Sequence, residues 1–118
     1  MSGQIDQIRK RHLIDSPETV TTDWSTKAQT LDDRTGPFSL FLKYENGTAV
    51  SMTIVVQMST NLVDWADITE TEVPVVDNTG TVLYDIDGSG TQFVRIAIRV
   101  NSGSIDVVDA QFIGSQFH

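Results

Sequence analysis

Histidine, the residue type that most often carries acid–base catalysis, is scarce in this sequence. Its two histidines are His12, near the start, and His118, at the end of the chain. Neither is a position that a rigid scaffold would hold. The sequence therefore predicts no Ser-His-Asp arrangement and no histidine-based metal site.

Paired carboxylates are the second candidate for catalysis, because glycoside hydrolysis uses two of them across the scissile bond. Asp64 with Asp67, and Asp106 with Asp109, are spaced so that the members of each pair could face one another. Acidic residues at strand ends are usually solvated instead. We therefore expect no catalytic residues, and we expect that the protein is not an enzyme.

The segment from Asp85 to Gly90 (DIDGSG) matches the first six positions of a calcium-binding EF-hand loop. Calcium takes about six to eight oxygen ligands, and the EF-hand draws two of them from a glutamate at position twelve. Position twelve is Ile96 here, which strand alternation places in the core. We expect a glycine-rich turn and no metal site, although the sequence leaves open whether a cation binds near Asp85 and Asp87.

The composition narrows the classes of partner. Sixteen Asp and Glu residues against eight Lys and Arg give a formal net charge of −8, which repels phosphate backbones. No apolar run approaches the roughly 20 residues of a membrane span, the first residues lack the apolar block of a signal peptide, and there are no cysteines. We expect a protein made in the cytoplasm that binds neither nucleic acid nor a membrane and takes no cofactor.

The dense group of positive charge lies near the start of the chain, where Arg9, Lys10, Arg11 and His12 follow one another. This group is either a solvated tail or an arm that docks on an acidic neighbour. Residues 1–36 show no sustained period, although residues 4–13 could form a helical turn or two and residues 20–30 a marginal strand around Trp24. We expect an irregular, extended arm over 1–36 and a domain over 37–118.

Alternation in the next segment predicts a β-hairpin. Apolar residues occupy every second position from Phe38 to Tyr44, and again from Val50 to Val56. Asn46-Gly47 lies between the two runs and favours a two-residue type I′ turn, because both residues tolerate positive φ.

The rest of the chain repeats this pattern. Further strands are predicted over 65–69, 72–76, 81–86, 92–100 and 104–113, with Asp-, Asn- and Gly-rich turns between them. Pro74 cannot donate to a neighbouring strand, so its strand is expected at an edge. These spacings predict an all-β fold, an antiparallel β-sandwich of jelly-roll or immunoglobulin-like kind, whose strand order stays open.

Several side chains fall on the less apolar faces of these strands. Arg95 and Arg99 share one such face and could pair with Asp106 or Asp109, or could pack on another subunit. Phe41, Val55 and Phe112 raise the same question: they belong either to a second core layer or to a contact patch.

The segment Gln57 to Ile68 (QMSTNLVDWADI) resembles one that recurs in β-sandwich proteins of tailed-phage virions. In those proteins a strand ends in Gln-x-Ser, a short Asn/Asp loop follows, and a Trp opens the next strand. Residues 36–41 and 94–98 suit the same picture, and the resemblance covers roughly residues 36 to 113. It implies a capsid decoration (cement) protein, or a similar small head or tail component.

The resemblance also implies partners and contacts. The partners would be the major capsid protein or other virion subunits, and the protein would be a homotrimer located in the virion. The expected contacts of the arm are Ile5, Ile8, Arg9, Lys10, Arg11, Leu13 and Trp24, and those of the sandwich face are Arg95, Arg99 and Phe41. The alternative is a carbohydrate-binding sandwich of a tail or host-recognition component, in which Trp65, Tyr44 or Tyr84 provides the stacking platform.

Overall fold

The computed structural model describes residues 7–31, 37–87 and 93–116 of the chain. All regular structure in these ranges is β, and the strands pair antiparallel, which confirms the predicted class. Among the described residues no helix is long and apolar enough to cross a membrane. The strands are β1 (Gln7–His12), β2 (Glu18–Val20), β3 (Trp24–Ser25), β4 (Gln29–Thr30), β5 (Pro37–Ser59), β6 (Ala66–Val75), β7 (Gly80–Asp87) and β8 (Phe93–Gln116).

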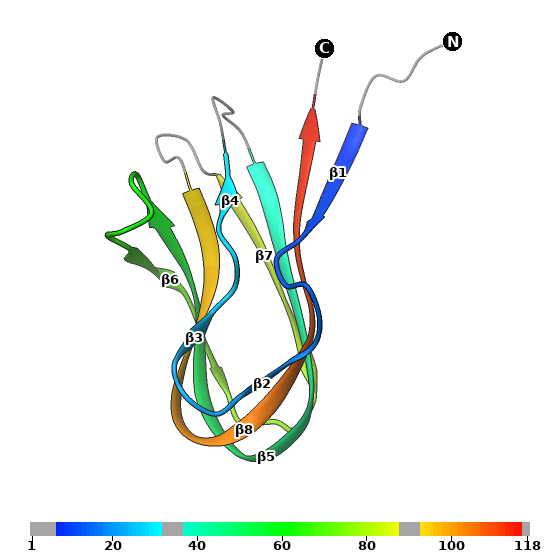
Figure 1. The fold of residues 1–118 in the computed structure, drawn as a ribbon, viewed down its shortest axis with the longest axis vertical. Coiled ribbons are helices and arrows are strands. Elements are labelled where there is room, and N and C mark those ends of the chain that lie inside the picture. Colours follow the sequence, from blue (N-terminus) through cyan, green and yellow to red (C-terminus); the bar gives the residue numbers. More distant parts are fainter. Residues whose placement is uncertain (1–6, 32–36, 88–92, 117–118) are drawn as a thin grey trace.

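Strands β5 and β8 form the spine of the molecule, pairing from Ser39 with Ile113 at one end to Ser59 with Phe93 at the other. Figure 1 shows β5 descending on the right and rising on the left while β8 runs the opposite way, and both strands bend together at the bottom. The sheet is thereby folded into a sandwich of two layers. Layer A adds β1, β2 and β7 to one half of the spine, and layer B adds β3, β4 and β6 to the other half.

The bend of β5 replaces the predicted hairpin. Asn46 has a φ of 56° and Ala49 a φ of 50°, so this stretch does adopt the left-handed conformation. The chain nevertheless does not reverse, because Tyr44 before the bend and Ser51 after it both pair with β8. The prediction of an Asn46-Gly47 hairpin is therefore wrong, since these two residues lie inside one continuous strand.

Strand β8 bends at the same level, at residues 101–103, where the sequence predicts a turn. Gly103 has a φ of 85°, and a Cβ at this position would lie 2.4 Å from the carbonyl oxygens of Thr48 and Ala49. Only glycine combines this conformation with so close an approach of the two backbones. The strands predicted over 92–100 and 104–113 are consequently one strand.

The core fills the space between the two layers. Its fully buried side chains lie at alternate positions along the spine and include Leu40, Leu42, Ile54, Val56, Val94, Ile96, Ile98, Ile105 and Val107. This pattern confirms the predicted inward faces of the long strands. Burial of each such side chain contributes about 1.5–3 kcal/mol, so the alternation is the main source of stability.

The N-terminal segment is extended, as predicted, but it lies on the chain's own sandwich. β1 pairs with residues 111–116 of β8, so a helical turn is excluded over the described part of residues 4–13. The short strands β2, β3 and β4 then follow β8 in place of one marginal strand. Leu13, Val20 and Leu31 are buried in the core, because these apolar side chains gain most by leaving water.

Strand β6 is the edge of layer B, as Pro74 indicated, but the two strands predicted over 65–69 and 72–76 form a single one. Its register with β5 shifts between Ile54 and Val56. At this irregularity the Thr71 hydroxyl accepts the Val56 N–H at 2.8 Å and donates to the Ile68 carbonyl at 2.6 Å. The threonine side chain thus satisfies backbone groups that the ladder leaves unpaired.

Candidate functional site

The predicted contact residues of the arm have different surroundings. Lys10 and Arg11 are exposed on β1. Leu13 is 1% exposed, and its N–H donates to the Ala110 carbonyl at 2.7 Å, so it has no surface to offer a partner. Ile5 and the side chains of Ile8 and Arg9 lie outside the described residues. Trp24 is half-buried between the core and the outer surface.

The acidic residues considered for catalysis bond to other side chains. Asp106 accepts hydrogen bonds from Asn46 at 2.9 Å and from Thr19 at 2.8 Å. Both bonds lower the pKa of Asp106, and the bond from Asn46 has the larger effect. Asp109 lies 3.3 Å from the exposed His12 ring. Asp109 therefore forms a surface ion pair with His12 when His12 is protonated, and Asp106 and Asp109 each have partners of their own.

The remaining acidic candidates also have partners of their own. Asp64 accepts from the Asn61 side-chain amide at 2.9 Å, and Asp85 accepts from the Ser39 hydroxyl at 2.6 Å. Residues 88–90 of the calcium-like segment and the Asp87 side chain lie outside the described residues. Over the residues that the structure covers, no group of three or more His, Cys, Asp or Glu side chains could hold a metal ion.

The loop between β5 and β6 is closed by its own side chains. The Ser59 hydroxyl accepts the N–H groups of Asn61 at 3.1 Å and Leu62 at 2.9 Å. The Asn61 side-chain oxygen accepts the N–H groups of Val63 at 2.9 Å and Asp64 at 2.8 Å. Four loop N–H groups are therefore satisfied by Asn61 and by Ser59, the last residue of β5, and these bonds fix the loop.

This closed loop presents two apolar side chains, Leu62 and Val63, which we call the loop tip. Leu62 is 50% exposed and Val63 is 78% exposed. Leu62 also has a φ of 68°, a conformation that costs an ordinary side chain roughly 1–2 kcal/mol. Its carbonyl accepts the Trp65 indole N–H at 3.2 Å, which ties the tip to the start of β6.

A series of linked hydrogen bonds and ion pairs between side chains crosses the outer face of layer B. Arg99 pairs with Asp67 and, at 3.7 Å, with Glu72. Asp67 accepts from the Gln57 amide at 2.9 Å, and Gln57 in turn accepts the Arg95 Nε–H at 2.8 Å. The hydrogen bond from Arg99, followed by that from Gln57, lowers the pKa of Asp67.

The partners of the two arginines differ from those predicted. Neither pairs with Asp106 or Asp109, because β5 and β6 supply the groups on this face. Arg95 instead stacks over the Trp65 ring, with its guanidinium carbon 4.1 Å from the ring centroid. Burial lowers the pKa of Arg95, and no carboxylate among the described residues forms an ion pair with it.

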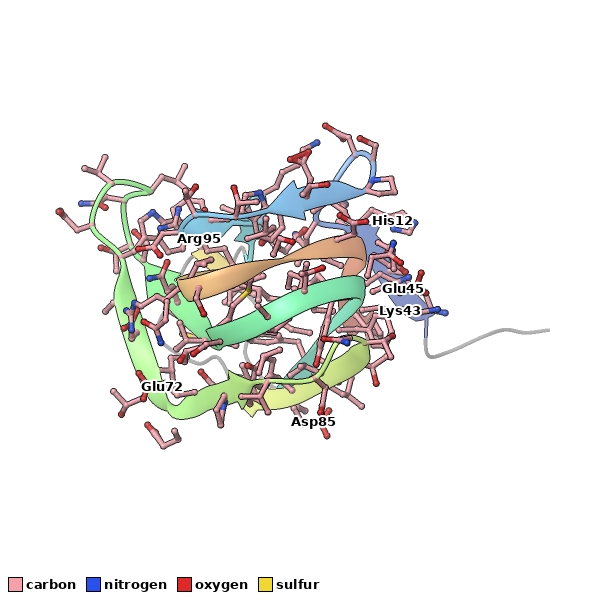
Figure 2. The ribbon with its side chains drawn as sticks, turned by 90° about the horizontal axis from the view of Figure 1, so that it is seen from below. His12, Lys43, Glu45, Glu72, Asp85 and Arg95 are labelled. Atoms are coloured by element: carbon pink, nitrogen blue, oxygen red, sulfur yellow. The ribbon has the colours of Figure 1, made fainter. Side chains whose placement is uncertain are left out.

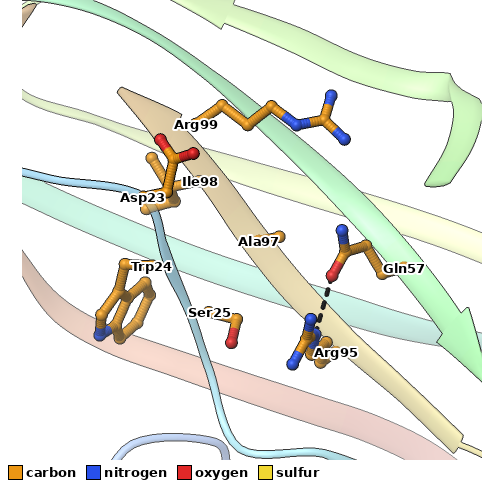
Figure 3. A pocket seen from close by; sticks show the side chains of 8 residues that line it. All are labelled: Asp23, Trp24, Ser25, Gln57, Arg95, Ala97, Ile98 and Arg99. Atoms are coloured by element: carbon orange, nitrogen blue, oxygen red, sulfur yellow. Dashed lines mark hydrogen bonds between the residues drawn. The ribbon is translucent and has the colours of Figure 1, made fainter. Parts of the chain in front are cut away.

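A shallow hollow of about 280 Å³ lies beside Arg95, between β8 and residues 23–25. Figure 3 shows Ser25 and Arg95, which is bonded to Gln57, on one side of the chain of residues 23–25, and the Trp24 ring on the other side. Ala97 also lines the hollow. Trp24 pairs with the inward-facing Ile98 and packs against the core, so the outer-face side chains that line the hollow are Ala97 and polar groups.

The outer face of layer A carries a small apolar patch. Leu83 of β7 is 62% exposed and is aligned with the half-buried Phe41 of β5. Val55 and Phe112, which the sequence left open as core or contact residues, are buried. Only Phe41 of that group contributes to the surface. Figure 2 places His12 and Lys43 of this layer on the opposite side of the molecule from Arg95 and Glu72.

Two of the proposed stacking platforms are excluded by burial. Tyr44 is 5% exposed and Tyr84 is 7% exposed, and the Tyr84 hydroxyl donates to the Ile54 carbonyl at 3.2 Å. Burial raises the pKa of both phenols. Both predictions are wrong because these rings lie on the inward faces of β5 and β7. Trp65 stays half-exposed, but Arg95 covers one side of its ring.

The loop tip and Leu83 were not recognised as candidates from the sequence. Ser59 and Asn61 carried a signal, because such side chains close short turns on neighbouring N–H groups. Nothing in the local sequence indicates that Leu62 would adopt positive φ. Leu83 lies at an outward position of an alternating strand, and such a position is noticed only once the inward face is known.

No model of a known protein family matches the chain, and no curated protein matches it. Its structure is similar to a solved structure described as TmCBM61 in complex with β-1,4-galactotriose, with a TM-score of 0.38 and 12% identity. The similarity covers 94% of this chain and 88% of that one. At this TM-score the likeness carries no argument about function.

Proposed function

We propose that this protein is a structural subunit of a tailed-phage virion, of the capsid-decoration type, which stabilises the shell by protein–protein contacts. The observation that carries the proposal is the loop tip. Leu62 and Val63 are exposed on a loop whose N–H groups are satisfied internally. The phage assignment itself rests on the resemblance of residues 57–68, the segment that contains this loop.

The tip has the properties of an anchor for a partner. A preformed loop loses little conformational entropy on binding, so more of the contact energy appears as affinity. Leu62 is held at a φ of 68° with half of its side chain in solvent, an arrangement that brings the isolated protein no stability. Contact with an apolar pocket of a shell subunit accounts for both features.

The patch of Leu83 and Phe41 provides a second, separate contact surface on layer A. A homotrimeric decoration protein needs two kinds of contact, one with the shell and one between its own copies. We assign the loop tip to the shell and the layer A patch to contacts within a homotrimer. Lys10 and Arg11 lie exposed on the same layer and suit an acidic neighbour, because the chain as a whole is acidic.

Binding to shells tests the proposal. Purified capsids that lack the protein are mixed with wild-type protein, Val63→Ser or Val76→Ser and then pelleted. Val76 is 70% exposed away from the tip and serves as the matched control. We expect wild type and Val76→Ser to pellet with the capsids and Val63→Ser to bind about tenfold more weakly, because one apolar side chain contributes about 1.5 kcal/mol. Failure of the wild type to pellet, or equal binding of all three proteins, would overturn the proposal.

A further inference from the structure

Layer A ends in two strands that each have one unpaired edge. Among the described strands, β1 pairs only with β8 and β7 pairs only with β5, so the order across the layer is β1-β8-β5-β7. An unpaired edge presents a row of backbone N–H and C=O groups that can take up a further strand. Figure 2 places His12 of β1 and Asp85 of β7 at the two ends of this layer.

The edge of β7 lacks the features that usually block such pairing. The strand pairs with β5 over its whole length, Gly80–Asp87, with no register shift and no proline. The edge of layer B is different, since β6 contains Pro74 and its register with β5 is irregular. Leu83 of β7 adds an exposed apolar side chain. Of these two edges, that of β7 is therefore the better suited to take up a further strand.

The charges of the two end strands indicate which strand can pair with β7. β1 has the sequence QIRKRH and carries no acidic residue, whereas β7 has the sequence GTVLYDID and carries no basic one. Lys10, Arg11 and Asp85 are exposed, and neither Lys10 nor Arg11 forms an ion pair with another described residue. Pairing of two β1 strands or of two β7 strands brings like charges together, whereas pairing of β1 with β7 brings opposite charges together.

The register within layer A brings these charges to the same level. One row of aligned residues crosses the outer face from edge to edge, through Lys10, Ile113, Ser39 and Asp85. β1 also runs antiparallel to β7, because three antiparallel pairings separate them. A copy rotated about an axis along these strands therefore brings its β1 antiparallel to β7, with its Lys10 opposite Asp85.

We infer that copies of this chain join head to tail by strand pairing, with β1 of one copy beside β7 of the next and Lys10 opposite Asp85. A head-to-tail contact forms a closed ring when the rotation between copies closes, and three copies then make the homotrimer of the proposed function. The inference rests on that contact between copies, which it deepens by naming the paired strands. It does not depend on binding to a capsid.

Cysteine cross-linking tests the pairing, because the chain has no cysteine of its own. The neighbouring row of the outer face runs through His12, Gln111, Phe41 and Leu83, so the inferred contact places His12 opposite Leu83 and leaves the charged pair in place. Full-length His12→Cys and Leu83→Cys are mixed and oxidised. We expect a cross-linked dimer from the mixture and none from either protein alone. Glu70→Cys, at an exposed position of β6, replaces His12→Cys as the control and should give none.

The variant with both cysteines tests closure of the ring. Within one copy the two positions lie three strand spacings apart, or about 14 Å. A disulfide spans less than about 7 Å between Cα atoms, so each cross-link joins two copies. We expect covalent trimers, and a ladder of longer open chains would overturn the closed ring.

Charge reversal tests the pair of Lys10 and Asp85. Lys10→Asp and Asp85→Lys should each raise the Kd of the oligomer about tenfold in sedimentation experiments, because an attraction across the strands becomes a repulsion. The double variant should associate as the wild type does. Glu70→Lys, which reverses one exposed acidic charge on layer B, is the control and should leave the Kd unchanged. Circular dichroism shows that each variant is folded.

The outcomes separate the inference from the proposed function. Cross-linking of His12→Cys or Leu83→Cys with itself would overturn the head-to-tail arrangement. An oligomer that neither cross-links in the mixture nor responds to charge reversal would overturn the strand pairing and leave a homotrimer through another surface. A monomeric wild type would overturn both, while the contact of the loop tip with the shell is tested separately by pelleting with capsids.

Discussion

At Leu62 the backbone adopts a conformation that leucine seldom takes, in a loop whose N–H groups are bonded by the side chains of Ser59 and Asn61. Strain of this kind, when a protein retains it, points to a use outside the isolated fold. The proposed contact with a shell subunit supplies that use. It also predicts that stability and binding can be separated at this residue.

Leu62→Asn should raise the free energy of unfolding by about 0.5–1 kcal/mol, because asparagine tolerates positive φ better than leucine. Urea unfolding of the isolated protein measures this difference. The same substitution should weaken capsid binding, since it removes an apolar side chain from the tip. Val63→Asn, at the neighbouring exposed position, serves as the control and should bring no stabilisation. A loss of stability in Leu62→Asn would contradict the assigned strain.

Asp67 predicts a pH dependence. Its pKa in the folded protein lies below the ordinary 3.8, chiefly through the hydrogen bond from Arg99. The carboxylate therefore contributes stability that is fully present above this ordinary value and is lost as the pH falls through the lowered pKa.

Wild type should accordingly be more stable than Asp67→Asn near neutral pH, and the difference should shrink as the pH falls below 3.8. Urea midpoints of the two proteins, taken at a series of pH values, measure this gap. A gap that stays constant down to the acid limit would show that the ion pair with Arg99 brings no net stability.

Among the elements, the shared bend of β5 and β8 determines the shape of the sandwich. Gly103→Ala should destabilise the protein by about 3 kcal/mol, because alanine must adopt positive φ there and its Cβ meets two backbone carbonyls. Asn101→Ala, at an exposed position of the same bend, should cost much less. Thermal unfolding compares the two variants, and similar costs would contradict the proposed role of the close approach.

The N-terminal segment is likewise an element of the fold. Leu13→Ala should cost about 2–4 kcal/mol, since it opens a cavity in the core. Leu83→Ala, which shortens an exposed side chain, should be nearly neutral. Denaturant unfolding measures both. Equal costs would contradict the inclusion of Leu13 in the core.

Deletion of residues 1–15 would also remove Leu13. Such a deletion would therefore disturb the fold as well as any contact of the N-terminal segment with a partner.

The sequence predicted which side chains of each strand point inward better than it predicted how successive strands are connected. Alternation placed Leu40, Ile54 and Ile96 inside correctly, because burial acts on each strand separately. It could not distinguish a hairpin at Asn46 from a bend, since both need positive φ and only pairing with a distant strand decides. Alternation likewise placed Arg95 and Arg99 on an outer face. It could not predict their partners on β5 and β6, because these depend on which distant strands pair with β8 or lie beside it.

On the scale of the whole molecule, two surfaces for contact lie on different layers of one sandwich. The loop tip belongs to the side of β6, and the patch of Leu83 and Phe41 belongs to the side of β7. Figure 2 shows that labelled residues of the two layers point away from each other. A subunit so arranged could meet a shell through one layer and its own copies through the other.

Electron cryomicroscopy of the phage particle tests the central claim most directly, because it shows whether and how the protein lies on the shell. The proposal predicts copies of the folded sandwich on the capsid surface, each with Leu62 and Val63 seated in an apolar pocket of a shell subunit. Particles that lack the protein, or copies whose loop tip faces solvent, would contradict it.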